Sequence, residues 1–216
     1  MSKVRLSYQT IEFDKTDVHV CSLRDTQEFS DPKGIAEKLG ISSANWSLFG
    51  VIWPSSLVLA HHISSLKVGT KRTLEVGCGM ALSSLLLNKK NADITATDYH
   101  PEAEKFLLRN TELNDDENIN FERVSWEDNN TQLGKFDLII GSDLLYEDQH
   151  INLLALFLNK HANKKCEVIL VDPGRGRKNK LSTLMIEFGF ICSHRKPSHT
   201  NYLEKEFKGH ILNFVR

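Results

Sequence analysis

An almost wholly apolar run, Phe-Asp-Leu-Ile-Ile-Gly-Ser at positions 136–142, constrains the fold more than any other segment of the chain. A strand with one face in water alternates apolar and polar residues, whereas a strand buried on both faces reads as a nearly continuous apolar run. Strands of the second kind occur in parallel sheets that helices cover on both sides. The run therefore predicts the central strand of a parallel sheet in an α/β fold.

Strand patterns and helical patterns alternate around this run. The helical pattern at 101–114 carries Ala103, Phe106, Leu107 and Leu113 largely on one stripe. We expect strands at residues 72–76, 93–97, 119–124, 136–142, 167–171, 191–195 and 210–215, and helices at 53–66, 80–90, 101–114, 149–162 and 178–188. Such alternation indicates right-handed crossovers and a mainly parallel, doubly wound sheet. We expect the last two strands to form a hairpin at one edge, which makes one of them antiparallel.

The N-terminal part of the chain has a different pattern. Residues 4–13 and 18–23 alternate like strands, and the polar residues between them predict the turn of a β-hairpin. Asp31-Pro32 opens a short helical stretch that ends at Gly40. Because the chain has no repeat and no Pro/Ser-rich linker, we expect a leader over residues 1–52 and one main domain over residues 53–216.

Charge and composition exclude several classes of partner. The 27 Lys and Arg nearly balance the 28 Asp and Glu, so the chain has no general basic field for nucleic acid or an anionic membrane. Its longest apolar stretch, 153–158, is too short to cross a bilayer, and its N-terminus lacks the apolar core of a signal peptide. The four cysteines show neither CxxC nor His-paired spacing. We expect a reduced, cytoplasmic protein with no metal site and no nucleic-acid or membrane partner.

A glycine loop follows the first strand of the main domain, in the order Glu75-Val76-Gly77-Cys78-Gly79. Glycines at this place let the backbone turn tightly and let a ligand approach without a Cβ atom in the way. Asp98, at the end of the next strand, lies 21 residues after Gly77. At this spacing a carboxylate can accept both hydroxyls of a bound ribose. The pattern predicts a nucleoside site at the carboxyl ends of the strands.

The loop does not fit the common phosphate-binding motifs. The dinucleotide fingerprint G-x-G-x-x-G has a third glycine where this chain has Leu82. The chain also has no G-x-x-x-x-G-K-[ST] sequence, which phosphate-binding loops of nucleotide hydrolases contain. Glu75, two residues before Gly77, suits a cationic ligand better than a phosphate. NAD is therefore a poor candidate.

Glu75-x-Gly77-x-Gly79 followed by Asp98 resembles the first two signatures of the seven-strand, class I methyltransferases that use S-adenosylmethionine. This resemblance implies a Rossmann-like fold with S-adenosylmethionine as cofactor. It also implies that the glycine loop passes the methionyl part and that Asp98 holds the ribose. The cofactor has two positive groups and one carboxylate, so acidic surroundings are electrostatically favourable.

Three further stretches narrow the resemblance to the methyltransferase-like lysine methyltransferase family, over roughly residues 46–216. They occur in the order 50–57 with Trp53-Pro54, then Trp126-Glu127-Asp128, then Asp143-Leu144-Leu145-Tyr146. The resemblance implies that Trp53 helps to cover the cofactor and that Trp126 borders the adenine. Stacking and cation–π attraction give an aromatic face at either place a physical basis. Simple packing in the core or at its rim is the alternative for both tryptophans.

Asp143 and Tyr146 are the candidate catalytic residues. Asp143 ends the buried strand, where it can orient an acceptor amine and draw off positive charge. An ordinary carboxylate, with a pKa of about 4, is a poor base toward an ammonium group, so Asp143 is either a positioning residue or a base. If the connection is helical, Tyr146 lies on a similar face and can reach the same acceptor. A helix N-cap with a packed tyrosine is the alternative.

The segment after the fifth strand, Asp172-Pro173-Gly174-Arg175, resembles one branch of the same lysine-directed group. Its basic cluster fits a contact with an acidic protein surface or a carboxylate. It fits a solvated turn that opens the next helix equally well.

These patterns predict a methyltransferase that acts on a protein, at lysine. Leu144 and Leu145 stand where enzymes that methylate adenine or glutamine often have two prolines, which makes those acceptors less favoured. A small-molecule N- or O-methyltransferase and a non-catalytic nucleoside-binding partner protein are the alternatives. We expect the leader to cover the cofactor or to form part of the acceptor pocket. A sealed lid would favour a small acceptor, and an open groove would favour a protein.

Overall fold

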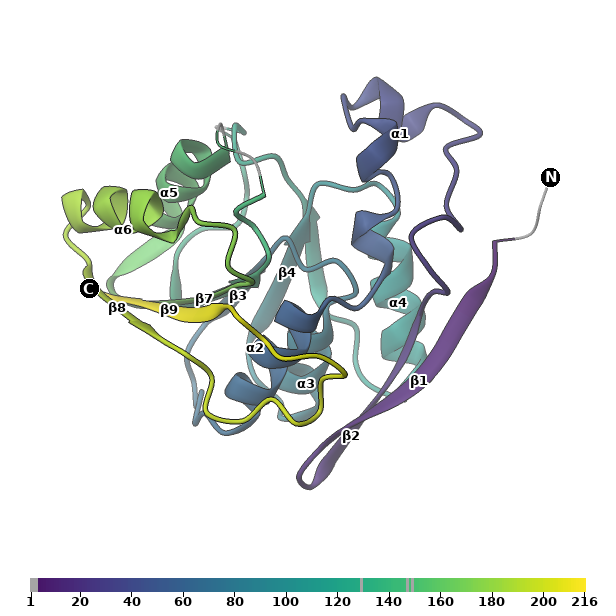
Figure 1. Ribbon diagram of the computed structural model, residues 1–216, viewed down its shortest axis with the longest axis horizontal. Coiled ribbons are helices and arrows are strands. Elements are labelled where there is room, and N and C mark those ends of the chain that lie inside the picture. Colours follow the sequence, from purple (N-terminus) through teal and green to yellow (C-terminus); the bar gives the residue numbers. More distant parts are fainter. Residues whose placement is uncertain (1–3, 129, 147, 149) are drawn as a thin grey trace.

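The computed structural model describes residues 4–128, 130–146, 148 and 150–216. Within these residues a sheet of seven strands has the order β5-β4-β3-β6-β7-β9-β8 (Figure 1). The strands are β3 (Thr73–Val76), β4 (Ile94–Asp98), β5 (Asn120–Arg123), β6 (Phe136–Ser142), β7 (Ala162–Asp172), β8 (Ile191–Arg195) and β9 (His210–Val215). The predicted α/β fold with a mainly parallel sheet is confirmed.

Strand β6 lies at the centre, parallel to β3 and β7. Ile139 and Ile140 are both fully buried, in apolar clusters on opposite faces of the sheet. Burial on both faces is the reason for the continuous apolar run. The predicted edge hairpin is confirmed as well: β9 is its antiparallel member and lies between β7 and the edge strand β8.

Helices cover both faces of the sheet. α2 (Pro54–Ser64), α3 (Leu82–Lys89) and α4 (Ala103–Leu113) contribute to one apolar cluster, and α5 (His150–His161) and α6 (Lys178–Glu187) contribute to the other (Figure 1). From β3 the chain runs through β4 to β5 at one edge, while from β6 it runs toward the other edge. The connections that follow β3 and β6 therefore diverge and leave a crevice at the carboxyl ends of the strands.

The leader begins with the predicted hairpin, in which β1 (Leu6–Phe13) and β2 (Thr16–Leu23) pair antiparallel as a separate sheet. Asn110 of α4 and Asn114, which directly follows α4, bind the free edge of β2. The Asn110 side chain accepts from the Cys21 N–H at 2.7 Å and donates to the Cys21 carbonyl at 3.2 Å. Asn114 makes the same pair of bonds to the backbone of His19, at 2.9 and 2.7 Å. These amides replace a neighbouring strand, so the buried edge keeps its hydrogen bonds.

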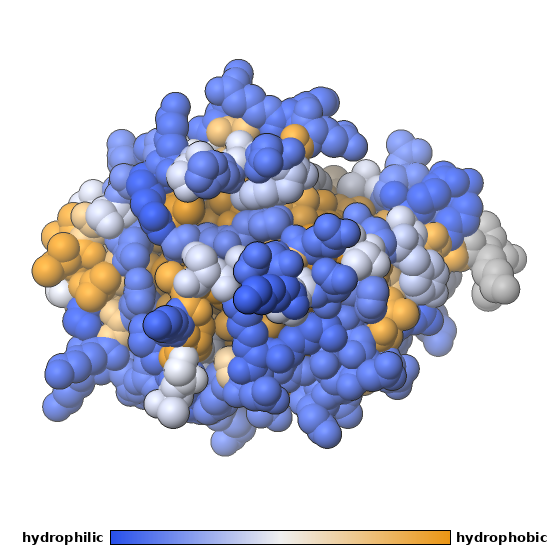
Figure 2. All heavy atoms as spheres, turned by 90° about the horizontal axis from the view of Figure 1, so that it is seen from below, coloured by the Kyte–Doolittle hydropathy of each residue, from blue (hydrophilic) through white to orange (hydrophobic). Residues whose placement is uncertain are grey.

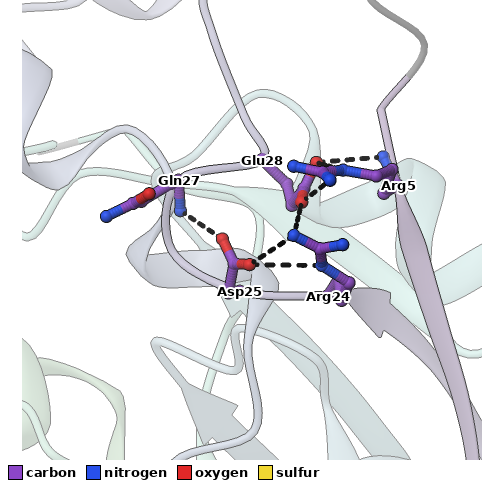
Figure 3. A network of polar contacts seen from close by, with 5 residues as sticks. All are labelled: Arg5, Arg24, Asp25, Gln27 and Glu28. Atoms are coloured by element: carbon purple, nitrogen blue, oxygen red, sulfur yellow. Dashed lines mark hydrogen bonds and ion pairs between the residues drawn. The ribbon is translucent and has the colours of Figure 1, made fainter.

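A charged network lies at the open end of the hairpin, where β1 begins and β2 ends. Glu28 forms ion pairs with Arg5 at 2.8 Å and with Arg24 at 3.0 Å (Figure 3). Asp25 accepts hydrogen bonds from the Arg24 side chain and from the Gln27 N–H. The network joins the start of β1 to the segment after β2. From there the leader continues through α1 (Ile35–Lys38) and two short 3₁₀ turns, Ser43–Asn45 and Leu48–Gly50.

Some predicted boundaries were wrong. The buried residues of α4 are Ala103, Leu107, Asn110 and Thr111, whereas Leu113 of the predicted stripe is 38 % exposed. Strand β7 begins earlier than predicted, directly after α5, and extends over residues 162–172. The predicted helix start at Gln149 lies outside the described residues.

The surface is mainly hydrophilic on the face shown in Figure 2, with hydrophobic patches scattered among polar side chains. The largest exposed fractions of aliphatic side chains belong to Ile191, Ile186 and Leu156, on β8, α6 and α5. Among the helices that the structure describes, none is long and apolar enough to cross a membrane.

Candidate active site

A cavity of about 1090 Å³ lies at the carboxyl ends of β3, β4 and β6. Its wall combines the glycine loop, the residues that follow β4 and β6, Trp126 and Arg175. The leader forms another part of the wall, through Leu39–Ser42, Ala44, Asn45, Leu48, Phe49 and Val51. A volume of this size is at the upper end for small-molecule sites and can hold a nucleoside cofactor together with an acceptor side chain.

The glycine loop needs its glycines for both backbone conformation and space. Gly77 and Gly79 have φ angles of 60° and 52°, in the left-handed region that other residues rarely adopt. A Cβ atom on Gly77 would lie 2.5 Å from a methyl carbon of Leu144, and one on Gly79 would lie 3.1 Å from the carbonyl oxygen of Phe49. The loop therefore packs tightly between the connection after β6 and the leader, with its backbone facing the cavity.

Asp98 ends β4 and faces the cavity beside this loop. One carboxylate oxygen accepts from the Gly79 N–H at 2.8 Å, and the other accepts from the His100 N–H at 2.8 Å. Burial raises the pKa of Asp98, and the backbone hydrogen bonds oppose that shift. Each oxygen keeps a lone pair for a further donor, so the carboxylate can also accept ribose hydroxyls.

Glu75 is buried inside the protein and lies outside the residues that line the cavity. Its carboxylate accepts from the backbone N–H of Ser84 at 2.9 Å and from the Ser84 hydroxyl. Burial raises the pKa of Glu75 to about 7, and the hydrogen bonds to Ser84 oppose the shift. The side chain ties β3 to the first turn of α3 behind the glycine loop. Its contact with a cationic cofactor stays a prediction.

Both candidate tryptophans line the cavity. Trp53 directly precedes Pro54, the first residue of α2, and its indole N–H donates to the carbonyl of Leu48 at 2.9 Å. Trp126 follows β5 and meets the ring of His150 edge-on, with centroids 5.8 Å apart. The two indoles are half-buried in the wall, where a bound ligand can contact them. Their roles as cofactor contacts stay predictions.

Asp143 and Tyr146 also line the cavity, on the connection after β6. Residues 143–146 are not helical: Asp143 has a φ of 57°, and its N–H donates to the carbonyl of Val171 at 2.9 Å. The condition for a helical arrangement of the two side chains is therefore not met. Asp143 also lies seven positions before His150, the first residue of α5, so it does not cap that helix. Tyr146 packs edge-on against the His150 ring, with centroids 5.5 Å apart.

The basic segment after β7 contacts carboxylates of this chain. The Nε atom of Arg175 lies 2.7 Å from Oδ1 of Asp143, and the Nε atom of Arg177 lies 2.8 Å from Oδ1 of Asp148. The hydrogen bond to Asp143 raises the pKa of Arg175. Arg175 lines the cavity, whereas Arg177 lies outside its wall.

Sequence reasoning missed His100 and Phe49, whose rings stack with centroids 3.8 Å apart in the cavity wall. Burial lowers the pKa of His100 to about 4, so the imidazole is neutral near pH 7. The position of His100 two residues after Asp98 was the available signal. No local pattern points to Phe49. Within the described residues, no group of three or more His, Cys, Asp or Glu side chains is arranged to hold a metal ion.

Comparison with known families identifies the domain that surrounds this cavity. Residues 36–186 match the lysine methyltransferase family. This chain belongs to that family. The matched span starts inside the predicted leader, and the division of the chain at residue 52 stays a prediction.

The chain is similar to two mouse proteins of known name. It is 29 % identical over 139 residues to the electron transfer flavoprotein beta subunit lysine methyltransferase, covering 62 % of this chain and 52 % of that protein. It is 30 % identical over 177 residues to protein N-lysine methyltransferase METTL21A, covering 76 % of this chain and 81 % of that protein. The alignment with the first relative thus spans only about half of that protein's length.

The fold is similar to that of magnesium protoporphyrin IX methyltransferase (ChlM) from Synechocystis, solved with bound S-adenosylmethionine. The TM-score is 0.61 at 16 % identity, and the match covers 87 % of this chain and 98 % of the other. At this level of identity the likeness shows the shared Rossmann-like fold alone.

Proposed function

We propose that this protein transfers a methyl group from S-adenosylmethionine to the side-chain amine of a lysine in a protein substrate. One observation carries the proposal: a single cavity is lined both by Gly79 and Asp98 and by Asp143 and Tyr146. A nucleoside cofactor and a methyl acceptor can meet in such a cavity. Membership of the lysine methyltransferase family supports lysine as the acceptor.

The residues present fit this cofactor. A Cβ atom on Gly77 would clash with Leu144, so the loop keeps a bare backbone facing the cavity. The Asp98 carboxylate is placed to accept ribose hydroxyls, and the Trp126 ring offers a face for an adenine. When bound, the cofactor supplies an electrophilic methyl group on a sulfonium.

The chain's own residues must then bind the acceptor amine, orient its lone pair and exclude water, since positioning supplies much of the catalysis in a one-step displacement. Asp143 and Tyr146 are the groups available for orientation. A lysine ammonium must also lose a proton before it can react, because only the neutral amine has a free lone pair.

The acceptor end of the cavity opens to solvent, which favours a side chain that enters from a protein surface. Tyr146 is 38 % exposed, and the Arg175 side chain is 39 % exposed. A lysine, with its four-carbon stem, can reach from such an opening toward the inner cavity while its own backbone stays outside.

Incubation with methyl-labelled S-adenosylmethionine and a lysate of the cells that express the protein tests the proposal. We expect label on protein bands and methyl-lysine after acid hydrolysis. Label confined to the small-molecule fraction would contradict a protein acceptor and support the small-molecule alternative. Cofactor binding without any transfer would support a non-catalytic binding protein.

A matched pair of variants tests the cofactor's place. Asp98→Asn removes the charge at the cavity, and we expect cofactor affinity to fall about tenfold or more. Asp93→Asn removes an exposed charge at the opposite end of β4 and should leave the affinity unchanged. Equal affinity of the two variants in equilibrium dialysis would show that the cofactor binds elsewhere. A cytoplasmic location stays a proposal, which cell fractionation tests.

A further inference from the structure

Arg175 reaches the acceptor end of the cavity from a different part of the fold than Asp143. It lies on the connection between β7 and α6, whereas Asp143 follows β6. The Nε–Oδ1 distance between them is 2.7 Å, and the Asp143 side chain is only 12 % exposed. An acceptor amine that enters this end of the cavity therefore meets a carboxylate that is already paired with a guanidinium.

Opposite charges at this place have opposite effects on an amine. A carboxylate alone stabilises the ammonium form of a bound lysine, which is not nucleophilic. A neighbouring guanidinium disfavours the ammonium form, because like charges repel. Three titratable groups act on Arg175: Asp143, Asp172 and Tyr146. All three are acidic groups, so the Arg175 guanidinium supplies the positive charge of this set.

We propose that Arg175 is a positioning residue of the transfer reaction: it holds the Asp143 carboxylate toward the acceptor and keeps the acceptor amine from binding as an ammonium. This inference rests on the proposed function and adds a role for one residue of the same site. Arg175 acts through Asp143 and through its charge, without bonding to the transferred methyl group.

Arg177 offers a matched control from the same segment. It forms the same kind of ion pair, Nε to Oδ1 of Asp148 at 2.8 Å, but Asp148 is 72 % exposed and Arg177 does not line the cavity. Arg177→Gln therefore removes an identical charge and a similar ion pair two residues away, without changing the acceptor end. Any effect on general attraction of an acidic protein substrate should be shared by both variants.

The first experiment measures methyl transfer against pH for the full chain. The probe is labelled S-adenosylmethionine with the most strongly labelled protein band of the lysate. We expect Arg175→Gln to lower transfer at pH 7 about tenfold and to move the rising limb of the pH profile to higher pH. Arg175→Lys keeps the charge and should keep the limb near its wild-type position, and Arg177→Gln should behave as wild type.

A double-variant cycle separates positioning from independent substrate binding. The rates are compared at a pH above the rising limb, where the acceptor amine is neutral in every variant and the charge of Arg175 no longer affects its protonation. If Arg175 positions Asp143, adding Arg175→Gln to Asp143→Asn should lower this rate little beyond the effect of Asp143→Asn alone. Rate losses that multiply would overturn the inference, as would an Arg175→Gln rate and pH profile identical to those of Arg177→Gln.

Cofactor affinity, followed by tryptophan fluorescence, keeps the two proposals apart. A wild-type protein that neither binds S-adenosylmethionine nor labels any acceptor contradicts the proposed function. A wild-type protein that does both, beside an Arg175→Gln variant with unchanged transfer, contradicts only the role of Arg175. If Arg175→Gln loses cofactor affinity through misfolding, Arg175→Lys decides the inference. A rising limb of its pH profile at the wild-type position supports the inference, and a limb moved to higher pH contradicts it.

Discussion

The Glu75 carboxylate accepts two hydrogen bonds from Ser84, one from its backbone N–H and one from its hydroxyl. This contact joins β3 to the first turn of α3, where a negative charge also interacts favourably with the helix dipole. The turn between the two elements is the glycine loop. The Glu75–Ser84 contact therefore supports the glycine loop from outside the cavity lining.

Removal of the Ser84 hydroxyl should destabilise the protein. We expect Ser84→Ala to lower the free energy of unfolding by about 1–2 kcal/mol, because a buried hydrogen bond to a carboxylate is lost. Ser83 is the matched control, since it is equally buried on the same helix but its hydroxyl has no hydrogen-bond partner among the described residues. Ser83→Ala should leave stability unchanged or slightly higher. Urea unfolding measures both, and equal losses would show that the Glu75–Ser84 hydroxyl bond contributes nothing.

Glu75 and His100 should give opposite slopes to the dependence of stability on pH. Burial raises the pKa of Glu75 from 4.5 to about 7, so its contribution is present below pH 4.5 and is lost as the pH rises through 7. Burial lowers the pKa of His100 from 6.5 to about 4, so its contribution is present above pH 6.5 and is lost as the pH falls through 4. Each effect amounts to about 3 kcal/mol, so the two nearly cancel between these limits.

Single substitutions should reveal each slope. In Glu75→Gln, relative to the wild type, the free energy of unfolding should increase with pH from 4.5 to 6.5, because the opposing slope of Glu75 is removed. In His100→Asn it should decrease over the same range. Urea titrations at three pH values measure the slopes. Two variants with the wild-type profile would show that neither group changes its protonation on folding.

A side chain at Gly77 should disturb both stability and the cavity. Gly77→Ala puts a Cβ atom 2.5 Å from Leu144, at a φ of 60°. Gly69→Ala is a matched control, because Gly69 has a φ of 61° and open space around the added atom. We expect Gly77→Ala to cost about 1–3 kcal/mol more than Gly69→Ala and to weaken cofactor binding. Equal unfolding curves and equal affinities would contradict the close packing of this loop.

The leader hairpin should depend on the side-chain amide of Asn110. Asn110→Ala leaves the N–H and carbonyl of Cys21 unpaired, and we expect a loss of about 2–3 kcal/mol with faster proteolysis of the hairpin. Glu112→Ala changes an exposed residue of the same helix and should have little effect. Limited proteolysis with urea unfolding compares the two, and identical cleavage rates would show that the hairpin is held by apolar packing alone.

The sequence predicted the fold well where local pattern suffices. The run at 136–142 indicated a strand buried on both faces. The glycines at 77 and 79 indicated a tight turn, which the structure forms with left-handed backbone at both positions. The apolar stripe at 101–114 indicated the helix but not what binds it. Asn110 and Asn114 hold the hairpin through hydrogen bonds to its backbone, which a hydrophobic pattern does not detect.

The candidate site was predicted in part for the same reason. Motifs at the carboxyl ends of parallel strands meet at one edge of the sheet. Asp98 and Asp143 were each predicted at such a strand end, and both line the cavity. Glu75 shares a motif with Gly77, but Gly77 lies beyond the end of β3. The regular alternation of side-chain directions in a strand therefore does not extend to the loop. Its side chain lies under the loop, against Ser84.

The sequence by itself determined the α/β layering, the glycine turn and the strand ends where the site lies, because each depends on periodicity or on backbone conformation within a few residues. Tertiary structure alone decided which leader residues line the cavity and that Arg175 pairs with Asp143, 32 residues away. Such contacts depend on how crossovers and loops pack against one another. No local pattern in the sequence around the interacting residues predicts that packing.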